Sequence, residues 1–185
     1  VGEVVFGGNK LHFSVDNNGH SAPVRQILVD EKRNEIITIS EDKSIGFWGL
    51  ETFEKKEIIH VNEGNGRRGV LYDAEFTPDS NFLVLAGLLT NEEDSLNYLK
   101  IFNLNSKKVV AKINLRTSLT KEMQFSPDGK LLYVSGGDNT LEVLRVISST
   151  DLKHVDVFSL PFELNDICQG LGEDLYLASQ DGNIY

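Results

Sequence analysis

Residues 19–50 contain side chains that could carry out nucleophilic chemistry. His20, Thr38 and Asp42 are the residue types of an array in which a carboxylate orients an imidazole and the imidazole activates a hydroxyl. The same stretch ends near Trp48, whose single N–H can only donate a hydrogen bond. These four side chains can equally form a buried structural network, so the surrounding elements must decide between the two interpretations.

The other candidate reactive residues stand apart from one another. Cys168, the single cysteine, falls at the phenylalanine position of a repeat described below, so we expect a buried core thiol rather than a nucleophile. No pair of histidines has metal-ligand spacing with a third ligand nearby; the histidines are His12, His20, His60 and His154. We therefore expect no metal, no cofactor and no enzymatic activity.

Charge and composition narrow the class of partner. The formal net charge of −10 disfavours nucleic acids and anionic membranes, because both require a positive footprint. No apolar run approaches the roughly 18 residues needed to span a bilayer. The single cysteine and the absence of any Asn-x-Ser/Thr sequon favour an intracellular, cytoplasmic location. The chain begins without Met and ends inside an expected strand, so we expect a piece of a longer polypeptide.

The chain contains two nearly identical stretches, EFTPDSNFLVLAG and QFSPDGKLLYVSG. Phe76 and Phe125 mark the same position in them, and the register extends to Val29 and Cys168 with spacings of 47, 49 and 43 residues. Seven residues after each of these positions an apolar strand begins, at Ile36, Leu83, Leu132 and Leu175. This period is typical of a four-stranded propeller blade.

The segments within each repeat are short, rich in β-branched and aromatic residues, and bounded by turn residues, with no amphipathic helix among them. They predict an all-β fold, a β-propeller of four-stranded antiparallel blades, with roughly four blades here out of a ring of about seven. The expected parts of this single domain are a partial blade at 1–18, blades at 19–61, 62–114 (with an inserted loop at 88–97) and 115–160, and a partial blade at 161–185.

The first complete repeat begins with Gly-His at position 19, has a turn aspartate at Asp42 and ends on Trp48-Gly49. It resembles a WD40 repeat, and the match is tight only in this blade; the third repeat is also similar to YVTN-type propellers. The resemblance implies a buried chain of hydrogen bonds from Trp48 to Thr38, His20 and Asp42, which is a structural network and not a nucleophile array. It also implies a non-catalytic scaffold for protein–protein interaction within a larger protein or complex.

Two irregular loops predict where a partner binds. The stretch NEGNGRRGV carries Arg67 and Arg68, and the insertion LLTNEEDSLN carries Glu92, Glu93 and Asp94. In a four-stranded blade the loop before the first strand and the turn between the second and third emerge on one face, here beside Glu41 of the preceding blade. This mixed-charge face is the candidate docking surface, and the alternative is that its charges only pair with one another across solvent.

Two alternative functions stay open at this point. The Arg-Arg-Gly element resembles the lipid-binding element of PROPPIN propellers, which would imply phosphoinositide binding. A propeller enzyme of the lactonase or dehydrogenase type would need a repeated set of inward ligands, and the sequence does not offer one.

Overall fold

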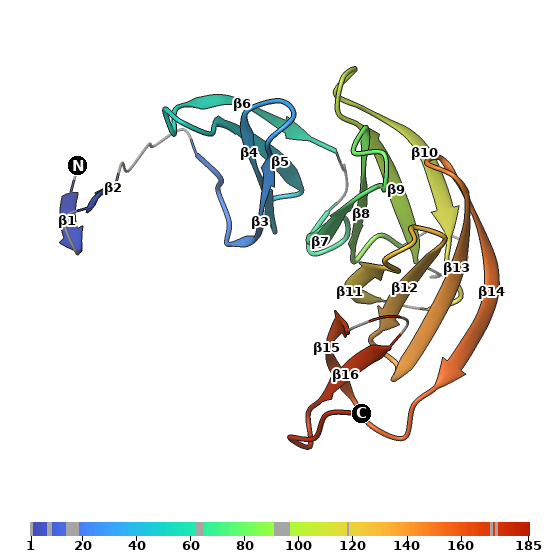
Figure 1. The fold of residues 1–185 in the computed structure, drawn as a ribbon. Helices are drawn as coiled ribbons and strands as arrows, with labels where there is room; N and C mark the ends of the chain where they lie inside the picture. The colour runs from blue at the N-terminus through green and yellow to red at the C-terminus, as the bar shows by residue number, and fades with distance from the viewer. Residues whose placement is uncertain are drawn as a thin grey trace.

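A computed structural model describes residues 2–6, 9–13, 19–61, 65–90, 97–117, 119–170, 172 and 174–185. Within these residues every regular secondary-structure element is a β-strand. The strands pair antiparallel into three four-stranded sheets and two two-stranded sheets (Figure 1). The described residues hold no helix that is long and apolar enough to cross a membrane.

The three four-stranded sheets, called blades 1 to 3 below, follow one another along the chain. Blade 1 consists of β3 (Val24–Asp30), β4 (Glu35–Ser40), β5 (Ser44–Gly49) and β6 (Lys55–His60). Blade 2 consists of β7 (Leu71–Phe76), β8 (Phe82–Gly87), β9 (Tyr98–Asn103) and β10 (Lys108–Asn114). Blade 3 consists of β11 (Thr120–Phe125), β12 (Leu131–Gly136), β13 (Thr140–Ser148) and β14 (Asp151–Ser159).

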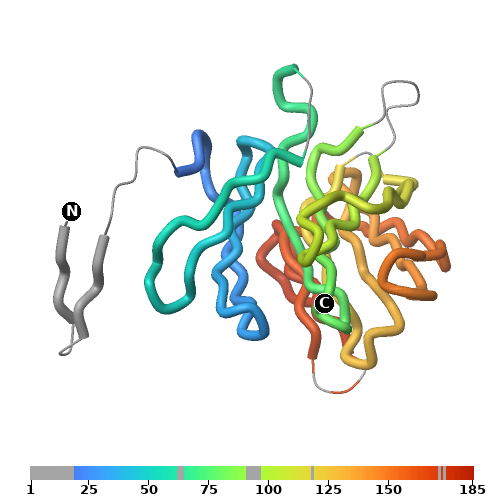
Figure 2. Tube along the Cα trace, turned by 90° about the horizontal axis from the view of Figure 1, so that it is seen from above, coloured from blue at the N-terminus to red at the C-terminus, as the bar shows by residue number. Residues whose placement is uncertain are grey.

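Two shorter sheets complete the strands. The first joins β1 (Gly2–Phe6) to β2 (Asn9–Phe13), and the second joins β15 (Leu164–Gln169) to β16 (Leu175–Ser179). The first strands of successive blades contact each other, β3 with β7, β7 with β11 and β11 with β15, so they form the inner edge of an arc (Figures 1 and 2). This arrangement is part of a β-propeller.

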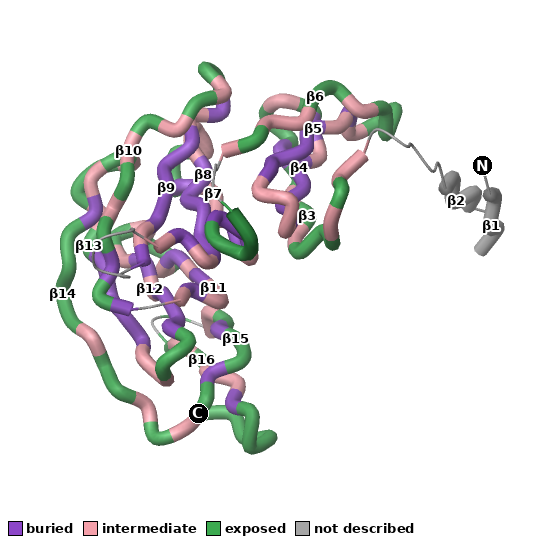
Figure 3. Tube along the Cα trace, turned by 180° about the vertical axis from the view of Figure 1, so that it is seen from behind, coloured by how far each residue is buried: buried purple, intermediate pink, exposed green. Residues whose placement is uncertain are grey.

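The core of the molecule lies between the blades. Side chains along a strand alternate between the two faces of its sheet. In β8, Leu83 and Leu85 therefore pack with blade 1, whereas Val84 and Ala86 pack with blade 3. Because both faces of blade 2 are covered, β8 is continuously apolar, as is typical of strands buried on both sides. The outer strand β14 is mostly exposed (Figure 3).

The Pro-Asp turns close the first hairpin of blades 2 and 3 in the same way. Asp79 accepts a hydrogen bond from Thr77 Oγ1 at 2.7 Å, and Asp128 accepts one from Ser126 Oγ at 2.8 Å. The proline presets the first turn angle, and Gly129 adopts a left-handed φ of 66° that closes the second of these turns without strain. The two stretches that revealed the repeat thus fold into equivalent turns.

The prediction that Cys168 is a buried core thiol is wrong, because Cys168 is exposed. In blades 1 to 3 the equivalent paired residues are seven apart, as Phe76 and Leu83 are. In the last hairpin Gln169, and not Cys168, pairs with Leu175, so this connection is one residue shorter. A slip of one residue moves a side chain to the opposite face of its sheet, so Cys168 points away from the face of β15 that packs on blade 3 through Leu164 and Ile167.

Candidate functional site

The four side chains predicted to form a network lie together in blade 1. Trp48 of β5 donates through Nε1 to Thr38 Oγ1 at 2.8 Å, and His20 Nε2 lies 2.7 Å from the same oxygen. On the other side of the imidazole, His20 Nδ1 lies 3.1 Å from Asp42 Oδ2 in the β4–β5 turn. The network therefore joins the segment before β3 to β4, β5 and the turn between them.

The chemistry of each group sets the direction of these hydrogen bonds. The Trp48 indole can only donate, so Thr38 accepts from it and uses its own proton for His20 Nε2. This network assigns the His20 proton to Nδ1, where it is donated to Asp42. Thr38 is buried, and the side chains of His20 and Asp42 are only 4% and 6% exposed. The Thr38 hydroxyl is shielded from solvent, and it already accepts one hydrogen bond and donates another. This supports a structural network rather than a nucleophile.

The centre of this network leaves no room for a further side chain. Gly46 pairs with Thr38 across β4 and β5. A Cβ atom at Gly46 would lie 2.8 Å from His20 Nε2 and 2.9 Å from Trp48 Nε1, closer than carbon approaches these atoms. The glycine is therefore required by the three polar side chains around it.

Blades 2 and 3 carry a charged residue at the position of Gly46, opposite the fourth residue of the second strand. In blade 2 this residue is Lys100, which is 7% exposed and donates through Nζ to the carbonyl of Val61. In blade 3 it is Glu142, which is fully buried and accepts from the backbone N–H of Arg116 at 3.0 Å. Each blade thus ties its third strand to the segment before its first strand, by different chemistry.

Sequence reasoning missed Lys100 and Glu142, although the sequence contains a signal for both. Each interrupts an apolar run of its third strand, Lys100 in YLKIFNL and Glu142 in TLEVL. A charge in such a strand costs free energy unless it is hydrogen bonded, so an isolated charge there indicates a specific buried partner. The tertiary structure identified these partners, the carbonyl of Val61 and the N–H of Arg116.

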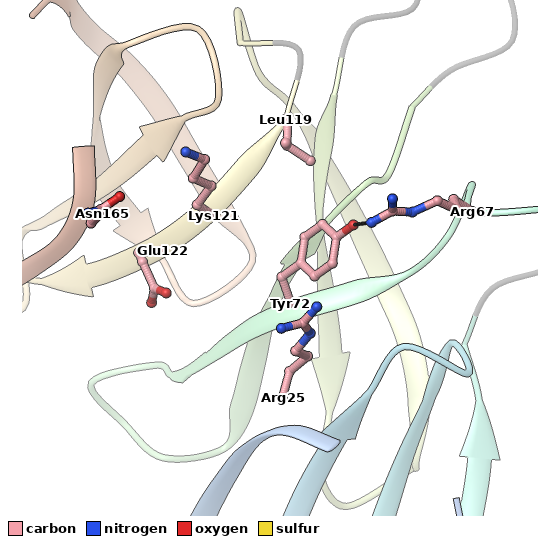
Figure 4. A pocket seen from close by; sticks show the side chains of 7 residues that line it. All are labelled: Arg25, Arg67, Tyr72, Leu119, Lys121, Glu122 and Asn165. Atoms are coloured by element: carbon pink, nitrogen blue, oxygen red, sulfur yellow. Dashed lines mark hydrogen bonds between the residues drawn. The ribbon is translucent and has the colours of Figure 1, made fainter. Parts of the chain in front are cut away.

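An open cavity of about 370 Å³ lies at the inner edge of the arc, and we call it the axial pocket (Figure 4). Four of its residues are each the second residue of a first strand: Arg25 of β3, Tyr72 of β7, Lys121 of β11 and Asn165 of β15. The lining is completed by Arg67, Leu119 and Glu122. The repeat itself therefore builds this pocket, because one position in every blade contributes to it.

The first strands that line the pocket are held together by side chains of the next position, the third residue of the strand. Gln26 Oε1 of β3 accepts from the backbone N–H of Ala74 in β7, and Asp73 Oδ2 of β7 accepts from that of Met123 in β11, both at 2.6 Å. Each first strand has an irregular pairing at this point. Such a bulge turns backbone groups out of the ladder, which leaves these N–H groups for the neighbouring blade.

The carboxylates next to the pocket resist ionisation. Burial, followed by the neighbouring carboxylates of Asp73, Asp166 and Glu75, raises the pKa of Glu122 to about 7. Burial and Asp73 raise the pKa of Glu75 to about 7 as well. Burial raises the pKa of Asp73 to about 6, although the backbone N–H of Met123 acts in the opposite direction. In the described part of the chain, no group of three or more His, Cys, Asp or Glu side chains could hold a metal ion.

Part of the predicted docking face lies beside the axial pocket. Arg25 forms an ion pair with Glu41 of the β4–β5 turn, and Glu41 also acts electrostatically on Arg67. Arg68 is exposed in the same turn as Arg67. The three acidic residues of the insertion, Glu92, Glu93 and Asp94, lie outside the described residues. Sequence reasoning missed Arg25 and Tyr72, because it did not compare the second positions of the first strands.

Comparison with known proteins identifies the repeat and the fold. Residues 117–143, in blade 3 rather than in the blade with the Gly-His and Trp features, match the WD40 family (WD domain, G-beta repeat). Similar solved structures include the WD40 β-propeller domain of Doa1, the WD40 repeats of RRP9 and U3-55K, each with a TM-score of 0.70. They are 17%, 17% and 16% identical to this chain over 90% of its residues. The chain spans about half of these structures, 51%, 48% and 49% of their respective lengths.

Proposed function

Because the chain contains a WD40 repeat within the fold of a WD40 β-propeller, we propose that this protein is a non-catalytic scaffold for protein–protein interaction. WD40 propellers generally bind other proteins, and we place the docking surface of this one around the axial pocket. The partner is a protein rather than a nucleic acid, in keeping with the net charge of −10. The cysteine-poor composition fits an intracellular scaffold.

The observation that carries this proposal is the shared lining of the axial pocket. Side chains from β3, β7, β11 and β15 meet there, so a ligand in the pocket contacts the inner strands of several blades at once. The packed first strands hold these side chains in fixed relative positions, which lowers the entropy cost of binding a partner.

The buried network supports the non-catalytic part of the proposal. The side chains that could form a nucleophile array, His20, Thr38 and Asp42, are hydrogen bonded within the network of blade 1 and shielded from solvent. The axial pocket is lined mainly by arginine, tyrosine, lysine and asparagine side chains, which suit recognition of a polar ligand.

The test is quantitative capture by the intact protein from cell extract. The double variant Arg67→Glu/Arg68→Glu reverses two exposed charges at the pocket rim. Proteins captured by the wild type should be lost by this variant, and the loss should depend on salt, because rim charges act through electrostatics. The melting temperature should stay unchanged, since both side chains are exposed and exposed charges contribute little to stability.

A matched control is the variant Lys130→Glu/Lys153→Glu, which reverses two exposed lysines in the β11–β12 turn and in β14, away from the pocket. It should capture the same proteins as the wild type. Equal losses in both double variants, or no loss in the Arg67/Arg68 variant, would contradict a docking surface at this rim.

A further inference from the structure

The axial pocket gathers cations from three separate elements of an acidic chain. Arg25 lies in β3, Arg67 in the turn before β7, and Lys121 in β11. We propose that this pocket binds an acidic segment of the partner protein, with an Asp or Glu carboxylate seated between Arg25 and Arg67. The proposal rests on the scaffold function and names the chemistry of the partner.

Tyr72 holds the two guanidinium groups in place for such a ligand. The Arg25 guanidinium carbon lies 5.6 Å from the centroid of the Tyr72 ring, and Arg67 donates to the Tyr72 hydroxyl at 3.0 Å (Figure 4). A cation above the ring and a cation at its hydroxyl are both restrained by one side chain. Less conformational entropy is therefore lost when a carboxylate binds them.

Two cations of the pocket already pair with carboxylates of the same chain. Arg25 pairs with Glu41, and Lys121 pairs with Glu163 at 2.8 Å. Both pairs are partly exposed, and such pairs contribute about 0–1 kcal/mol, so a ligand can exchange with them at little cost. Arg67 donates to a neutral hydroxyl, and a guanidinium has five N–H donors, so donors remain for a ligand.

Three inner strands carry an acidic residue directly after their pocket residue. Asp73, Glu122 and Asp166 follow Tyr72, Lys121 and Asn165 in their strands. Glu122 lines the pocket, but burial and its acidic neighbours raise its pKa to about 7, so its repulsion is reduced at neutral pH.

The net charge of −10 opposes an acidic partner only at a distance. At 0.1 M salt the Debye length is about 10 Å, so distant charges are screened while the two arginines act at contact. The local cations therefore decide binding, and the net charge lowers the association rate.

The test measures fluorescence anisotropy with the intact protein and two labelled peptides of eight residues. One peptide has four Glu residues spaced by Gly and Ser, and the other has Gln at the same four positions. The Glu peptide should bind about tenfold more tightly, as expected for a net gain of one charge-assisted hydrogen bond, because Arg25 gives up its pair with Glu41 when it binds the ligand. This preference should shrink at about 0.5 M salt.

Variants locate the site. Arg25→Gln/Arg67→Gln should abolish the preference for the Glu peptide, and Arg67→Gln alone, at a fully exposed side chain, should reduce it without affecting folding. Lys130→Gln/Lys153→Gln removes as many charges elsewhere and should retain the preference.

Several results would overturn the proposal. These are equal affinity for the two peptides, a preference that survives Arg25→Gln/Arg67→Gln, or binding of vesicles containing phosphatidylinositol phosphate in place of the Glu peptide. If the peptide preference is absent while Arg67→Glu/Arg68→Glu still loses captured proteins, the scaffold function stands and the acidic chemistry is wrong. If the preference is present and capture is unaffected, the acidic site stands and the docking surface is wrong.

Discussion

Replacing Trp48 with phenylalanine should destabilise the protein by about 1–3 kcal/mol. The change removes the N–H that donates to Thr38 Oγ1 at 2.8 Å and leaves this buried hydroxyl without a donor. The smaller ring also loses packing, but Trp48 is only partly buried, so water can fill part of the gap. For a chain of this size, each 1 kcal/mol corresponds to a decrease of roughly 2–4 °C in melting temperature.

Unfolding in urea, followed by far-UV circular dichroism, is the suitable assay, because Trp48 is the only tryptophan of this chain and its fluorescence is lost with it. Thr38→Val provides the second edge of a double-mutant cycle, since it removes the acceptor. The two changes should be less than additive, with a coupling of about 0.5–1.5 kcal/mol, because each removes the same hydrogen bond. Partner capture below the melting temperature should match the wild type.

The reasoning is refuted if Trp48→Phe unfolds at the wild-type midpoint. It is also refuted if the double variant is fully additive, since the indole and the hydroxyl would then act independently. Either result would show that the bond between β4 and β5 does not contribute to the stability of blade 1.

Three further changes test the packing and the charges. Gly46→Ala should destabilise by about 1–3 kcal/mol in urea unfolding, because its Cβ overlaps the polar network. Gly87→Ala should displace the turn that carries Arg67, because its Cβ would overlap the Val70 carbonyl oxygen, and binding of the Glu peptide should weaken in anisotropy measurements. Burial raises the pKa of Glu75 from 4.5 to about 7, so the folded state binds more protons than the unfolded state between these values and stability falls as pH rises through them. Glu75→Gln should reduce this loss of stability, which is measured as the difference between the urea midpoints at about pH 5.5 and pH 8. The same difference in the wild type and in the variant would show that burial of this carboxylate does not matter.

The fold was predictable because its signals are local. Alternating apolar residues, Pro-Asp turns and a period of 47–49 residues in blades 1 to 3 indicate four-stranded blades before any contact is known. The third strands were predicted as strands for the same reason. Two buried charges in them, Lys100 and Glu142, were not recognised as ties, because each contacts a backbone group in the segment before the first strand of its blade.

The sequence by itself determined the type of the elements, their order and the repeat positions of blades 1 to 3, since these depend on neighbours along the chain. Tertiary structure decided which positions meet. One residue fewer in the last hairpin moved Cys168 to the exposed face, which no strand pattern reveals. Arg25 and Tyr72 are 47 residues apart, and they meet only because β3 and β7 pack side by side at the inner edge of the blades. The axial pocket therefore depends on packing between blades, whereas the blades themselves depend on local sequence.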